Sequence, residues 1–100
     1  MSGTGDIPGE LLAIRGRIDE IDRAIVDLLR ERFALTHEVG LLKASRALEA
    51  LDARREEEKL KALTDLSEAN DLNPDLVRDL FRRIMEEVVS NHEKLRHPPR

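Results

Sequence analysis

The stretch LLAIRGRIDEIDRAIVDLLRERFALTHEVGLLK, residues 11–43, decides the fold of this chain. Alternating steps of three and four residues along it pick out one row: Leu11, Ile14, Ile18, Ile21, Ile25, Leu28, Arg32, Leu35, Val39 and Leu42. Nine of these ten positions are apolar, and the period is helical rather than two-fold. The row therefore predicts one long helix that buries this edge against another helix.

The charged member of the row, Arg32, does not suit a buried edge. A guanidinium group keeps its proton, and burying it without an anion is costly. Either Arg32 reaches outward to water or a negative group meets it inside.

The length of this helix predicts a second chain. A helix over residues 10–44 would be about 50 Å long at roughly 1.5 Å per residue. A compact domain of 100 residues has a radius of gyration of only about 13 Å. We therefore expect a second copy to cover the protruding part, in a symmetric homodimer.

Composition excludes several classes of protein. One hundred residues with 40% hydrophobic content predict one domain, and a net charge of −4 with two Phe and no Trp or Tyr argues against nucleic-acid binding. The lack of Cys excludes disulfides and thiolate chemistry and favours the cytoplasm. No run approaches 18 consecutive apolar residues, so we expect no membrane span, and three scattered His give no metal-ligand spacing.

Two shorter helices are predicted after the long one. Residues 44–51 break the rhythm and predict a loop, and Asp52 can cap a second helix that reaches about Ala69. The run Asn73-Pro74-Asp75 combines a capping side chain, a proline at the first helical position and an acid in the first turn. The sequence therefore predicts an all-α fold with three helices per subunit.

The predicted helical domain covers residues 10–95. Residues 1–9 hold three Gly and one Pro and predict a disordered lead, and residues 96–100 predict a frayed tail. The start of the chain has neither the basic residues nor the apolar run of a secretory signal.

The third helix has a predicted buried face made of Leu76, Val77, Leu80, Phe81, Ile84, Met85, Val88 and Val89. His92 follows Val88 by four residues and shares this face, where a histidine is more often a core or capping residue than a catalyst. His37 is expected at the surface. Gly40 weakens the long helix by roughly 1 kcal/mol relative to Ala, so we expect either that another helix approaches closely there or that the helix is kinked.

Several cations on the first two predicted helices can serve either helix stability or the binding of an anion. Lys43 follows Arg32 by eleven residues, so both project from nearly the same side, about 16 Å apart along the helix axis. They can hold opposite ends of a small dianion, although Lys43 also suits the negative end of a helix. Arg55 lies near the positive end of the second helix, against the dipole preference. Arg15, taken alone, suits a surface pair with Asp19.

In order along the chain, these features resemble the all-helical class of chorismate mutase. The resemblance covers residues 10–95 and rests on Leu11-Leu12-Ala13-Ile14-Arg15, Arg32, Glu38-Val39-Gly40-Leu41-Leu42-Lys43, Asp52-Ala53-Arg54-Arg55-Glu56, and Asn73 to His92 with Leu80-Phe81. It implies an intertwined homodimer of three-helix subunits with two active sites. It also implies conversion of chorismate to prephenate, in shikimate-derived aromatic amino acid biosynthesis, without metal or cofactor.

The resemblance implies roles for the cations of the long helix. Arg15 and Arg32 resemble the arginines that bind the substrate carboxylates, and arginine suits carboxylates because its fork is planar and bidentate. Lys43 matches the lysine that donates to the ether oxygen and to a carboxylate. Arg15 and Arg32 are seventeen residues apart, about 25 Å along a straight helix, so Arg15 must enter the site of the other subunit.

The same resemblance extends to the second and third helices. Arg55 matches an arginine of the pocket, and Asp52 and Glu56 match the pair near the ring hydroxyl. Two positions depart from the common pattern: Val88 stands where a serine often contacts a carboxylate, and His92 stands where a glutamine or glutamate faces the ether oxygen. We expect His92 to partner Lys43 there, which would make the rate depend on pH. The predicted catalytic residues are therefore Arg32, Lys43 and His92.

Two alternatives stay open. Isochorismate–pyruvate lyases and aminodeoxychorismate mutases share the fold, but Glu56 argues against the first and the pair of Asp52 and Glu56 against the second. A non-catalytic helical dimer or a regulatory module is the other alternative, and the departures at Val88 and His92 keep it open.

Overall fold

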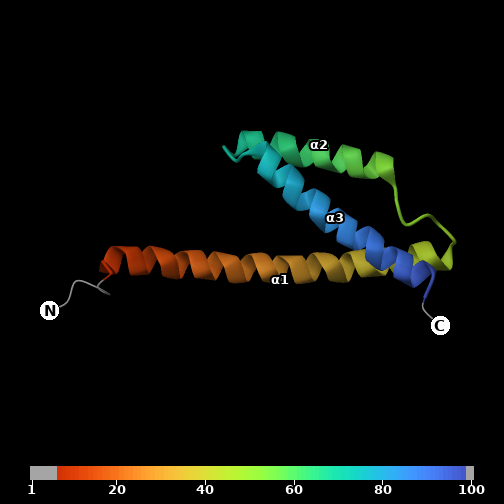
Figure 1. Cartoon of the computed structure of the whole chain (residues 1–100), viewed down its shortest axis with the longest axis horizontal. Helices are drawn as coiled ribbons and strands as arrows, with labels where there is room; N and C mark the ends of the chain where they lie inside the picture. The colour runs from red at the N-terminus through yellow and green to blue at the C-terminus, as the bar shows by residue number, and fades with distance from the viewer. Residues whose placement is uncertain (1–6, 99–100) are drawn as a thin grey trace. The chain divides into compact units, whose positions relative to one another are not determined.

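A computed structural model of the chain describes residues 7–98, and every regular element in that range is a helix (Figure 1). The helices are α1 (Gly9–Ser45), α2 (Ala53–Ala69) and α3 (Pro74–Arg96). The predicted all-α fold with three helices is confirmed. The chain divides into two units, one ending at Ala34 and the other beginning at Leu35, and α1 runs through the boundary.

Helix α1 is the long helix expected from the apolar row, with 37 residues. It begins one residue before the expected position, because the carbonyl of Pro8 accepts the N–H groups of Leu11 and Leu12 at 3.0 and 3.1 Å. Most of the predicted disordered lead, residues 1–6, lies outside the described residues.

The apolar row of α1 is open to solvent in the single chain. From Leu11 to Leu42, its nine apolar members are between 38% and 63% exposed. A monomer that leaves such a row uncovered loses the stabilisation that burial of apolar surface provides.

The end of α1 is a Schellman turn. The N–H of Leu48 donates to the carbonyl of Lys43 at 2.8 Å, and the N–H of Ala47 donates to that of Ala44 at 3.3 Å. Ala47 takes the left-handed conformation, with φ of 53°, which glycine usually occupies. The loop therefore covers residues 46–52, two residues later at its start than predicted.

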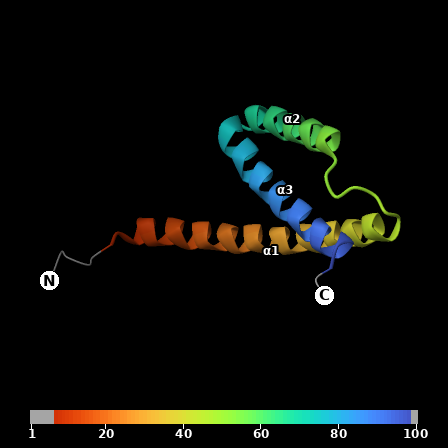
Figure 2. The same cartoon turned by 45° about the vertical axis from the view of Figure 1, so that its right-hand side comes forward.

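Helices α2 and α3 form an antiparallel hairpin (Figure 2). Both predicted starts are confirmed: the side chain of Asp52 accepts the N–H of Arg55 at 3.1 Å, and that of Asn73 accepts the N–H of Asp75 at 3.0 Å. The described core of this hairpin includes Leu60, Ser67, Ile84 and Met85.

The predicted buried face of α3 is only partly correct. Ile84 and Met85 are buried, but Leu76 and Leu80 are 64% and 52% exposed. The apolar positions of α3 span a wider arc than one neighbouring helix covers, so part of that arc stays exposed in the single chain.

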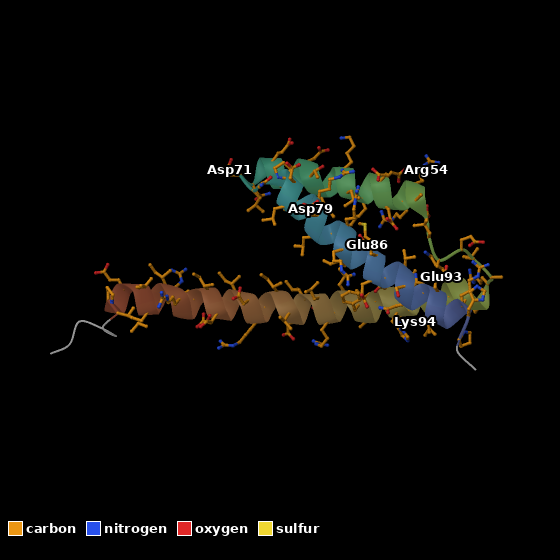
Figure 3. The ribbon with its side chains drawn as sticks, viewed as in Figure 1. Arg54, Asp71, Asp79, Glu86, Glu93 and Lys94 are labelled. Atoms are coloured by element: carbon orange, nitrogen blue, oxygen red, sulfur yellow. The ribbon has the colours of Figure 1, made fainter. Side chains whose placement is uncertain are left out.

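The end of α3 packs closely on the end of α1. A Cβ atom built on Gly40 would lie 2.6 Å from Cδ2 of His92 and 2.8 Å from Cδ1 of Leu95. The predicted close approach at Gly40 is therefore confirmed. Figure 3 labels Glu93 and Lys94 in these last turns of α3, at the same end of the unit as the loop after α1.

Candidate active site

Lys43 lies in the last turn of α1 and is half-buried. Its Nζ donates to the carbonyl oxygen of Ala50 at 3.1 Å, and Ala50 itself is only 4% exposed. An ammonium group carries three N–H donors, so this bond leaves donors that an anion can accept. Lys43 is thus held in a defined position next to the loop.

Three predicted site residues, Asp52, Arg55 and Glu56, lie at the N-terminal end of α2. Asp52 uses Oδ1 to cap the helix, which confirms its structural role and leaves Oδ2 for other donors. Arg55 is exposed and Glu56 is half-buried, one residue apart at the positive end of α2. Two acids and a guanidinium are therefore presented together at one helix terminus.

His92 is 4% exposed, and its ring makes a hydrogen bond to the backbone of α1. Its Nε2 lies 2.7 Å from the carbonyl oxygen of Thr36. A carbonyl only accepts, so Nε2 carries the proton and donates. Nδ1 is buried and has no hydrogen-bond partner among residues 7–98. Val88, one turn earlier on α3, is half-buried.

This arrangement bears on the predicted role of His92. A donor to the substrate ether oxygen needs a free N–H, and the Nε2–H is engaged with Thr36. His92 therefore has a packing role in this conformation, between α3 and Gly40. Its catalytic role stays a prediction.

Arg15 and Arg32 belong to the unit that ends at Ala34. Arg15 is exposed. Arg32 is half-buried, and its Nη1 atom is shielded from solvent.

An ion pair that the sequence did not predict lies next to this site. Nη1 of Arg96 lies 2.7 Å from Oε2 of Glu49. The hydrogen bond and charge of Arg96 lower the pKa of the Glu49 carboxyl below its ordinary value of 4.5, and Glu49 in turn raises the pKa of Arg96. Arg96 is the last residue of α3, although the sequence predicted that the frayed tail begins there.

Residues 7–98 contain neither a metal-binding cluster nor a membrane-spanning helix. No group of three or more His, Cys, Asp or Glu lies in an arrangement that holds a metal ion. No helix in this range is long and apolar enough to cross a membrane.

The fold and these side chains define an all-helical protein with cations and acids gathered at the ends of its first two helices. Residues 14–93 match the family described as chorismate mutase type II, and the chain belongs to that family. The family predicted from the sequence is thereby confirmed.

Several curated proteins are similar to the chain over most of its length. The T-protein of Enterobacter agglomerans is 40% identical over 82 residues, or 82% of this chain. Bifunctional chorismate mutase/prephenate dehydratases are 36% identical over 86% of the chain in Buchnera aphidicola subsp. Schizaphis graminum, and 34% identical over 85% in Escherichia coli K12. The chain spans 22% of the length of each of these relatives.

Proposed function

We propose that this chain is a chorismate mutase, which converts chorismate to prephenate by an intramolecular Claisen rearrangement. Membership of the chorismate mutase type II family is the observation that carries the proposal. The reaction serves the shikimate-derived synthesis of aromatic amino acids. We further propose a cytoplasmic location, in keeping with a chain that contains no cysteine.

The rearrangement makes one C–C bond and breaks one C–O bond within a single molecule, so the protein need not supply a nucleophile. It must hold the dicarboxylate in its folded, near-attack shape. Arg15 and Arg32 bind the two carboxylates in this proposal, because the planar guanidinium forms paired hydrogen bonds to a carboxylate. Lys43 donates to the ether oxygen, where negative charge gathers as the C–O bond breaks.

The start of α2 binds the ring end of the substrate in the same proposal. Asp52 and Glu56 face the ring hydroxyl, and Arg55 adds a positive group to the pocket wall. The capping bond between Asp52 and the N–H of Arg55 supports this, because it fixes one carboxylate in place before any ligand binds.

His92 and Val88 complete the proposed site on α3. For His92 to join Lys43 at the ether oxygen, its Nε2–H must exchange the carbonyl of Thr36 for the substrate. Val88 adds an apolar contact where a hydroxyl would give a hydrogen bond. These two positions distinguish the proposed site from the common pattern of the family.

The proposed active form is a homodimer in which Arg15 reaches the site of the other subunit. The exposed apolar row of α1 supports this, because a second copy would bury side chains that are 38–63% exposed in one chain.

The test is an assay of the purified chain with chorismate, isochorismate and 4-amino-4-deoxychorismate, in which prephenate and pyruvate are measured separately. Prephenate from chorismate is the expected result. Pyruvate from isochorismate as the main product would show a lyase. Rearrangement of only the amino analogue would show an aminodeoxychorismate mutase, and no turnover of any of the three would leave a binding or regulatory module.

A further inference from the structure

The loop of residues 46–52 joins two parts of the proposed site. Lys43 lies three residues before it, and Asp52 ends it as the cap of α2. The carbonyl oxygen of Ala50, in the middle of the loop, accepts the Lys43 ammonium at 3.1 Å. The position of this loop therefore decides where the ammonium group points.

Glu49, the residue before Ala50, connects the loop to α3 through an ion pair with Arg96. Oε2 of Glu49 lies 2.7 Å from Nη1 of Arg96, a residue 47 positions further along the chain. The Arg96 side chain is 25% exposed. The pair formed by Arg83 with Glu87 within α3 spans 3.4 Å, and the Arg83 side chain is 68% exposed. The pair at Glu49 is thus short and long-range, and its arginine is more shielded than Arg83, whereas the Glu49 side chain is 78% exposed.

The arginine of this ion pair lies on a part of α3 that is held in place by packing on α1. Arg96 lies one turn after His92, so both side chains project from the same side of α3. His92 is buried against Gly40 and bonded to the carbonyl of Thr36, which holds the last turns of α3 on α1. The contacts therefore run from α1 through His92 to Arg96, and from Glu49 through Ala50 back to Lys43.

We propose that Glu49 and Arg96 form a positioning pair that holds the carbonyl of Ala50 against Lys43 and so presets its ammonium group. This inference rests on the proposed function. A lysine stem has four rotatable carbons, and an unheld ammonium samples many positions. Prior placement of the donor lowers the reorganisation needed when charge develops on the ether oxygen.

The expected effect falls mainly on kcat. A donor that is better placed for the transition state than for the bound substrate changes kcat more than KM. We expect Arg96→Gln and Glu49→Gln each to lower kcat about 3- to 10-fold, with a smaller change in KM. The reversed pair, Glu49→Arg with Arg96→Glu, should recover part of the loss because the attraction is restored.

The matched control is Arg83→Gln, which removes an arginine and the ion pair that it makes with Glu87 within the same helix. It should leave kcat within twofold of wild type, on the order expected for an exposed pair. Should Arg96→Gln fail to fold, Glu49→Gln removes the same pair from a side chain that is 78% exposed.

A double-mutant cycle separates positioning from general stability. In a Lys43→Gln background the ammonium is gone, so Arg96→Gln should have no further effect on kcat. An equal further loss in that background would overturn the proposal. Hydrogen exchange supplies a readout that needs no activity: the Leu48 amide should exchange faster in Arg96→Gln and not in Arg83→Gln.

Failure of the inference and failure of the proposed function give different results. A full chain that does not convert chorismate overturns the proposed function, and the exchange measurement then judges the loop contact alone. If the chain is active but Arg96→Gln and Arg83→Gln have the same kcat and the same exchange rate of the Leu48 amide, the proposed positioning role is overturned. The proposed function then still stands.

Discussion

Replacement of Gly40 by alanine tests how closely α3 is seated on α1. The added Cβ would lie 2.6 Å from Cδ2 of His92, whereas ordinary contact begins at 3.4 Å. It would also lie 2.8 Å from Cδ1 of Leu95. Leu95 can yield by rotating, but the imidazole of His92 is buried and bonded to Thr36, so it cannot yield without losing that bond.

The magnitude follows from three opposing contributions. Alanine favours the helix over glycine by about 1 kcal/mol. Overpacking of a close contact costs about 1–3 kcal/mol, and a buried donor that loses its acceptor costs about 1–3 kcal/mol. We therefore expect Gly40→Ala to lower the free energy of unfolding by about 1–5 kcal/mol, since the two costs together exceed the helical gain.

Urea unfolding followed by helical circular dichroism, at fixed protein concentration, measures this change. Gly16→Ala is the matched control, because the same change in α1 meets no atom within 4 Å and should stabilise by about 1 kcal/mol. If Gly40→Ala proved as stable as Gly16→Ala, the close contact between α3 and α1 would be refuted.

Four further predictions concern the site and the fold. Arg32→Ala should lower the rate with chorismate at least about 10²-fold while circular dichroism stays unchanged; a normal rate would reject its assignment. Ala47→Gly should raise the free energy of unfolding by about 0.5–1 kcal/mol, because φ is 53° there; a lower free energy of unfolding in a urea titration would contradict this. Ile21→Lys should yield monomers in light scattering, since this side chain is 59% exposed and lies on the proposed dimer face; an intact dimer would exclude that face. Because Arg96 lowers the pKa of Glu49, the stability lost in Arg96→Gln should be constant above pH 4.5 and vanish as pH falls through the lowered pKa; a loss unchanged at pH 2 would exclude this ion pair.

Signals that lie within a few residues of one another predicted much of the fold. Asp52 and Asn73 were predicted as caps because a short acceptor before a helix satisfies nearby N–H groups, and both cap as expected. The period of the first apolar row predicted α1 to within two residues at its end. Gly40 predicted a close helix approach, because a glycine that weakens a helix needs a packing reason.

The remaining features depend on contacts between distant parts of the chain. Leu76 and Leu80 share the apolar pattern of Ile84, but the pattern does not say how wide an arc α2 covers. Glu49 and Arg96 are 47 residues apart, so no pattern among neighbouring residues in the sequence indicates that they pair. The partner of Lys43 is a backbone carbonyl, which every residue possesses, so side-chain identity could not reveal it.

The cap at Asp52 places two demands on one carboxylate. Its Oδ1 starts α2, and in the proposed function the same group meets the substrate hydroxyl. Asparagine would serve the first demand as well as aspartate but without the charge, whereas alanine would serve neither. Asp52→Asn should therefore keep α2 intact and weaken the proposed contact with the ring hydroxyl, whereas Asp52→Ala should weaken both.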